Sequence, residues 1–166
     1  MNLNDINLLF EFNYWAKGRM LGAVDSLSEE LLYNDLKTSF GTLHGTLVHI
    51  CAAEHVWLQR LIGMASPKFL TVADLPNITA VKSKWEEVEK GMLSYVHSLN
   101  EEQLQTTFTF LNFKGEPVSN VLWQALQHLV NHGTYHRGQI TSMIRQLGGT
   151  PANTDLIGFY RQKSND

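Results

Sequence analysis

Residues 119–149 read SNVLWQALQHLVNHGTYHRGQITSMIRQLGG, and this stretch decides how the whole chain is interpreted. Apolar residues recur in it at the three- and four-residue spacing of an amphipathic α-helix. Ser119 is a suitable N-cap residue, and Gly148 and Gly149 stand where such a helix would end. The pattern therefore predicts one long helix from Ser119 to Leu147.

Three other stretches share this periodicity. We expect helices over residues 4–26, 39–62 and 77–99, each with apolar residues along one face. The charged residues of 77–99 are expected to form its solvated face. The segment 28–39 is expected to be a connection with a short turn, and the tail after Pro151 could add one short helix.

Residues 106–119 break the helical pattern. Phe108 and Phe110 alternate with threonines, and Lys-Gly-Glu-Pro follows as a turn, so we expect a short strand or hairpin there. Four helices of about 20–29 residues favour helix-on-helix packing. The sequence therefore predicts an all-α four-helix bundle with a short hairpin-like insert before the last long helix.

Composition limits the function classes. The chain has 166 residues, 43% of them hydrophobic and 17% charged, which predicts one folded domain over residues 1–166. A net charge of −3 without a Lys/Arg tract argues against binding to nucleic acid or an anionic membrane. The single cysteine, Cys51, excludes an internal disulfide and a cysteine-based zinc site. With no transmembrane run and no secretion signal recognised, we expect a cytoplasmic location.

The histidines are the most informative residues. Six of the seven lie on two predicted helices, and His128, His132 and His136 repeat every four residues on the last one. They spread over only ~80° of the helix, on the same side as its apolar residues. An unpaired buried imidazole costs roughly 1–3 kcal/mol, so several on one face need partners. A metal ion would satisfy two or three at once, because side chains one turn apart can converge.

The third metal ligand must come from another helix. Helix 39–62 offers His44, His49 and His55, and periodicity does not choose among them. His49 is mildly favoured, because small residues on its flank would leave room for an ion. Three histidine ligands leave a position open for water or substrate, as in catalytic sites. The alternative interpretation is a set of hydrogen-bonded core histidines without metal.

Four other side chains on these two histidine-bearing helices carry expectations of their own. Glu54 lies on the inward face of helix 39–62, where it would either hydrogen-bond a ligand's second ring nitrogen or pair, partly exposed, with a neighbouring helix. Cys51 is interpreted as a buried, inert thiol. Tyr135 is interpreted as a packing residue that could also reach a substrate, and Arg137 is expected to face solvent or an interface.

Three stretches carry a resemblance to a known family: SFGTLHGTLVHICAAEHVWLQR, HLVNHGTYHRGQI and LGGTPANTDLIGFYR. Together they resemble the DinB-like family of damage-inducible bacterial proteins, over nearly the whole chain. The resemblance implies a four-helix bundle with up-down-down-up order, and a homodimer. It also implies that Gly138 lets another helix approach closely. The tail departs from the family pattern, with Pro151-Ala152 where two prolines are common.

The resemblance further implies a divalent ion, zinc or nickel, held by a histidine triad. The T-L-x-H-I stretch would contribute His49, and the H-x-x-x-H-R-G-Q motif His132 and His136, with His128 as a neighbour rather than a ligand. These residues form our predicted metal site.

The family resembles thiol-dependent S-transferases, which implies a metal-dependent transferase using a low-molecular-weight thiol. A hydrolase with water as the nucleophile is the other enzymatic hypothesis. The non-enzymatic alternative is a stress-induced metal-binding or partner-binding module. No substrate follows from the sequence.

Overall fold

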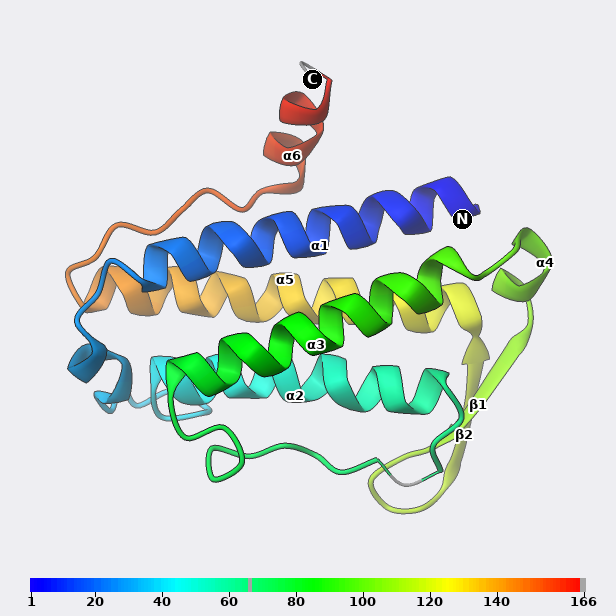
Figure 1. The fold of residues 1–166 in the computed structure, drawn as a ribbon, viewed down its shortest axis with the longest axis horizontal. Coiled ribbons are helices and arrows are strands. Elements are labelled where there is room, and N and C mark those ends of the chain that lie inside the picture. Colours follow the sequence, from blue (N-terminus) through cyan, green and yellow to red (C-terminus); the bar gives the residue numbers. More distant parts are fainter. Residues whose placement is uncertain (66, 165–166) are drawn as a thin grey trace.

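The computed structural model describes residues 1–65 and 67–164. Its four long helices are α1 (Leu3–Val24), α2 (Leu43–Leu61), α3 (Ile78–His97) and α5 (Leu122–Gln146). Along the long axis of the molecule, α1 and α5 run in one direction and α2 and α3 in the other (Figure 1). The predicted bundle with up-down-down-up order is therefore confirmed. Because α2 and α3 are parallel, residues 62–77 must return along the bundle to connect them.

Short elements occupy the ends of the bundle. A 3₁₀ helix, η1 (Glu29–Tyr33), lies in the predicted connection, and a one-turn helix that we did not predict, α4 (Glu101–Leu104), follows α3. Strands β1 (Thr107–Leu111) and β2 (Pro117–Val121) then form an antiparallel hairpin, as expected. Helix α6 (Leu156–Lys163) extends away from the bundle (Figure 1), and its Phe159 packs against α1.

The helix starts are determined by short polar side chains. Asn2, Thr42 and Asn77 accept hydrogen bonds from backbone N–H groups in the first turns of α1, α2 and α3. The predicted cap at Ser119 is wrong. Ser119 pairs with Thr109 in the hairpin, and their hydroxyls lie 2.8 Å apart. Because strand pairing continues to Val121, α5 begins only at Leu122.

A buried carboxylate connects the four long helices. Glu54 of α2 is 1% exposed and accepts hydrogen bonds from Asn13 Nδ2 of α1 and Trp85 Nε1 of α3, both at 3.0 Å. Asn13 Oδ1 in turn accepts from Arg137 Nη1 of α5 at 2.7 Å. Burial raises the pKa of Glu54, and the hydrogen bonds from Asn13 and Trp85 oppose that effect. The four side chains form one network, which we call the Glu54 network.

The structure corrects the expectation for Arg137 and part of that for Glu54. Arg137 is 2% exposed rather than solvent-facing, because α5 packs against α1 on one side and α2 on another. Gly133 leaves the space for it, since a Cβ there would lie 2.9 Å from Arg137 Nη1. Glu54 does pair with neighbouring helices, but it is fully buried and bonds no metal-site histidine.

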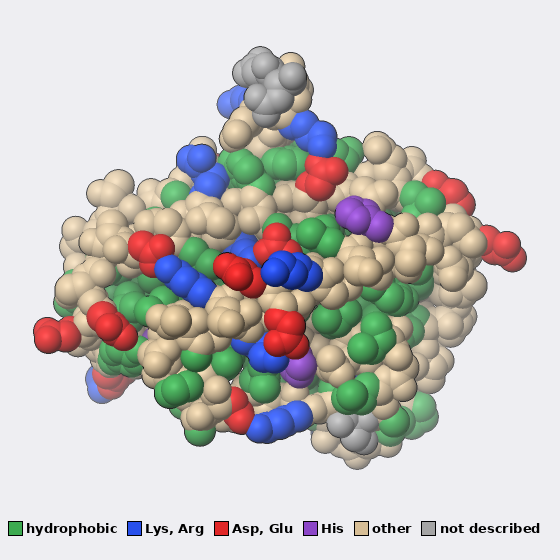
Figure 2. Space-filling model, viewed as in Figure 1, with side chains coloured by type: hydrophobic (Ala, Val, Ile, Leu, Met, Phe, Trp, Pro, Cys, Tyr) green, Lys and Arg blue, Asp and Glu red, His purple; other side chains and the backbone are tan. Residues whose placement is uncertain are grey.

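The surface agrees with the amphipathic pattern. Acidic and basic side chains are interspersed over the face that α3 covers, without a large area of one sign (Figure 2). Lys84 and Glu87 pair along α3, as expected for its solvated face. Among the described helices, none is both long enough and apolar enough to cross a membrane.

Replacing Glu54 with Ala should destabilise the protein by about 3 kcal/mol, because Asn13 Nδ2 and Trp85 Nε1 lose their acceptor and the Arg137 charge loses its carboxylate. Thermal unfolding followed by circular dichroism would measure the loss as a lower Tm. Glu86→Ala, on the exposed face of α3, is the matched control. Equal Tm values for the two variants would mean that the Glu54 network does not stabilise the bundle.

Candidate metal centre

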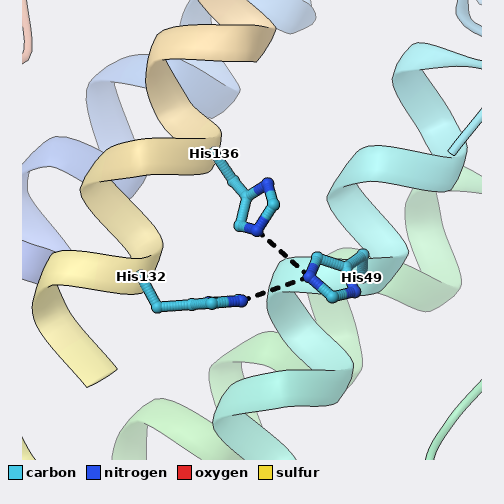
Figure 3. A group of neighbouring side chains, drawn as sticks. All are labelled: His49, His132 and His136. Carbon is cyan, nitrogen blue, oxygen red and sulfur yellow. Dashed lines mark hydrogen bonds between the residues drawn. The ribbon is translucent and has the colours of Figure 1, made fainter. Parts of the chain in front are cut away.

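Three imidazoles converge between α2 and α5. His49 Nε2 lies 3.2 Å from His132 Nε2 and 3.2 Å from His136 Nε2. His132 and His136 are one turn apart on α5, and His49 faces them from α2 (Figure 3). One ligand atom from each residue lies within 4.8 Å of the others. The structure thus brings together the three residues of the predicted site.

The spacing of the three nitrogens fits a divalent ion. Two nitrogens bound to zinc at ~2.0–2.1 Å with a tetrahedral angle would lie about 3.3 Å apart, close to the observed 3.2 Å. Hydrogen bonds alone explain the contacts less well. His49 Nε2 carries either one proton or one lone pair, yet it contacts two nitrogens at equal distance.

The other two histidines of α2 lie outside the group. His44 is buried and its ring packs 4.9 Å from that of Tyr33. His55 is half-buried and is not part of the cluster either. Helical periodicity left the choice open because both flanks of α2 carry a histidine, His44 and His55 on one and His49 on the other. Only the packing of α2 against α5 brings the His49 flank to the α5 histidines.

Burial keeps two of the three imidazoles neutral. It lowers the pKa of His49 to about 4, with a further contribution from His136. It also lowers the pKa of His132 to about 4, with smaller contributions from His136, His49 and His128. Both rings are therefore neutral at pH 7, which is the form that binds metal.

Gln139 fixes the orientation of the His136 ring. Its Oε1 lies 2.7 Å from His136 Nδ1, so with this amide orientation Nδ1 donates the hydrogen bond. The proton is then on Nδ1, and the lone pair of Nε2 faces the other two histidines. Sequence reasoning missed this role, although the i, i+3 spacing of His136 and Gln139 on one helix was a usable signal.

Aromatic rings surround the histidines. Phe40, just before α2, stacks on His49 with ring centroids 4.0 Å apart, and Phe69 lies 6.1 Å from the same ring. The ring centroid of His128 lies 6.1 Å from that of His132 and 5.5 Å from that of Trp57. His128 is thus a neighbour of the ligand group rather than a member of it, as expected. The site therefore combines polar ligands with largely apolar walls.

Three residues near the site can now be placed. Tyr135 is 65% exposed with its ring 4.9 Å from His136, so the packing interpretation was wrong. Cys51 is fully buried, and burial raises its pKa to about 12, so the inert interpretation was correct. Gly138 borders a cavity of about 640 Å³, and a Cβ at this position would have no neighbour within 4 Å, so no helix in the described part of the chain approaches it closely.

Fold and site together define a class of protein: a four-helix bundle with up-down-down-up order and three convergent histidines on α2 and α5. The sequence profile of the DinB family matches residues 1–165, and the chain belongs to that family.

Individual relatives agree with this assignment. Protein DinB of Bacillus subtilis (strain 168) is 29% identical over 157 residues, covering 92% of this chain and 91% of its own. The uncharacterized protein YizA of the same organism is 24% identical over 153 residues, covering 90% and 92%. The crystal structure of a DinB-like protein from Bacillus cereus ATCC 10987 superposes with a TM-score of 0.62 at 24% identity, covering 84% of this chain and 91% of that one. That last similarity supports the fold.

Gln139→Ala should weaken zinc binding about 10–100-fold, because His136 would lose the acceptor that holds its tautomer. Competition with a chromogenic chelator would measure the affinity. Gln139→Glu should retain or strengthen binding, since a carboxylate accepts the same hydrogen bond. Gln146→Ala, exposed near the end of α5, is the control and should bind as the wild type does. Unchanged affinity in Gln139→Ala would contradict the assigned role.

Proposed function

We propose that the protein binds one divalent metal ion, zinc or nickel, through Nε2 of His49, His132 and His136, and that it is a metal-dependent thiol transferase. The observation that carries the proposal is the convergence of the three imidazoles, with His49 Nε2 at tetrahedral-site spacing, 3.2 Å, from Nε2 of both His132 and His136. Membership of the DinB family supports it. Three imidazole ligands are compatible with either metal.

Such an ion supplies Lewis acidity that lowers the pKa of a coordinating thiol or water. The chain's own residues prepare the site for this chemistry. Two ligand rings stay neutral because they are desolvated, and Gln139 orients the third. Phe40 and Phe69 place apolar surface beside His49, which favours a weakly hydrated sulfur nucleophile over water.

Neither Cys51 nor Glu54, the two candidates for a nucleophile on α2, is free to react. The thiol of Cys51 is buried and its raised pKa keeps it protonated. Both oxygens of Glu54 are held by Asn13 and Trp85. The attacking group would therefore enter with the substrate, as a low-molecular-weight thiol does.

A non-enzymatic role is the second candidate function. The three ligands come from two different helices, so a bound ion would also connect α2 to α5. In that case the ion would stabilise the bundle without turnover.

His132→Ala should lose the bound metal, because two ligands on separate helices hold an ion far more weakly than three. Inductively coupled plasma mass spectrometry on protein purified without a histidine tag would measure the metal content. His44→Ala and His55→Ala should retain about one ion per chain, because neither side chain belongs to the cluster. An empty site in His44→Ala and a full site in His49→Ala would show that the ligands are misassigned.

The metal-loaded protein should catalyse conjugation of a small thiol to an electrophile such as 1-chloro-2,4-dinitrobenzene, and His132→Ala should not. The same preparations would be assayed on 4-nitrophenyl acetate to detect hydrolysis. Preferential thiol-dependent turnover supports the transferase. If the bound metal raises the Tm but the protein shows neither thiol conjugation nor hydrolysis, the structural role is favoured instead.

A further inference from the structure

Arg60 is a buried cation that has no anionic partner among the residues the structure describes. It lies at the C-terminal end of α2, is 8% exposed, and takes part in none of the ion pairs found in the described part of the chain. Its Nη2 donates to the backbone oxygen of Leu111 at 3.1 Å, and its buried Nε has no hydrogen-bond partner there. Burying a charge without a counter-charge is costly, so this arrangement requires an explanation.

Aromatic rings hold the guanidinium in place. Its Cζ lies 4.6 Å from the ring centroid of Phe110, 5.1 Å from that of Phe113 and 5.4 Å from that of Trp57. Cation–π contacts stabilise the charge partly, but they do not satisfy N–H donors. The Arg60 guanidinium is therefore held in a fixed position, while some of its N–H donors still lack hydrogen-bond acceptors.

A cavity of about 280 Å³ adjoins this side chain. Arg60 lines it together with the hairpin residues Leu111, Asn112, Phe113 and Gly115 and with part of the loop after α2. The carboxylate of the hairpin, Glu116, bonds Asn112 Nδ2 rather than Arg60. The cavity thus offers one cation, apolar walls and room for a small anion.

Two rows of aromatic rings connect this cavity to the histidine triad. The ring centroid of Phe69 lies 6.1 Å from that of His49 and 5.8 Å from that of Phe113, and the Phe113 ring contacts Arg60. Trp57, which contacts Arg60, has its ring centroid 5.5 Å from that of His128, and the His128 ring lies 6.1 Å from that of His132. His49 and Arg60 are eleven residues apart, so they share a face of α2 about 16 Å apart along the helix axis. An extended small molecule can span that distance.

We propose that Arg60 and its cavity form a carboxylate-binding subsite, which holds the anionic end of a substrate whose reacting group reaches the histidine triad. A carboxylate matches the planar guanidinium and supplies the missing counter-charge. The link to the triad rests on the proposed metal function, whereas anion binding at Arg60 does not.

Anion binding is tested first, on metal-free protein. Fluorine NMR would follow the binding of 4-fluorobenzoate and of its neutral analogue, 4-fluorobenzyl alcohol. Wild type should bind the carboxylate at least about tenfold more tightly than the alcohol, because a charge-assisted hydrogen bond is worth that much. Arg60→Gln should abolish this preference, and Arg60→Lys should retain part of it.

The matched control is Arg19→Gln. Arg19 also lies over an indole ring and donates to a backbone oxygen, but it is exposed. This variant should bind like wild type. Circular dichroism of every variant checks folding, since Arg60 also anchors the hairpin through Leu111. Equal binding of acid and alcohol by folded wild type, or an unchanged preference in folded Arg60→Gln, would overturn the subsite.

The connection to the triad is tested with zinc-loaded protein. Mercaptocarboxylates of increasing chain length would displace 4-fluorobenzoate, with the matching mercaptoalcohols as neutral controls. Those long enough to reach both sites should bind zinc-loaded protein at least about tenfold more tightly than metal-free protein. His132→Ala and Arg60→Gln should each remove the gain. No gain at any length, with zinc content verified, would overturn the link; failure to load zinc would instead refute the metal proposal.

Discussion

The bundle depends on the burial of one carboxylate. Glu54 is enclosed among four helices, and a charge in that position is tolerated only if hydrogen bonds and an opposite charge stabilise it. Asn13 and Trp85 supply the hydrogen bonds, and Arg137 supplies the opposite charge through Asn13. Each partner belongs to a different helix, so the helices cannot slide or rotate freely without breaking the network.

This constraint reaches the histidine triad through α5. Arg137 follows His136 in sequence, and Gly133, which leaves space for the guanidinium, follows His132. When Arg137 is held toward α1, the two histidines are turned toward α2. The network and the triad therefore use different faces of the same helical turns, because consecutive residues project about 100° apart.

The Glu54 network and the histidine triad differ in how many of their polar atoms have hydrogen-bond partners. Both carboxylate oxygens of Glu54 have donors. In the triad, two nitrogens compete for His49 Nε2, and His132 Nδ1 has no partner within the described residues. Arg60 resembles the triad in this respect, because its Nε also lacks a partner there. A cluster whose polar atoms all have hydrogen-bond partners stabilises the fold. Polar groups that lack partners and lie beside cavities or apolar walls are suited to binding ligands.

Local sequence signals were enough to predict the four long helices, the hairpin and the family resemblance, because helical periodicity and turn residues act over short stretches of chain. It also identified His132 and His136 as a pair, since their i, i+4 spacing lies within one helix. Tertiary structure decided what depends on contacts between helices. It brought His49 rather than His44 to the pair, buried Arg137 against α1, enclosed Glu54, exposed Tyr135 and placed Arg60 among the aromatic rings of the hairpin. The physical reason is that a helical wheel shows which residues share a face, but only packing decides which neighbour covers that face.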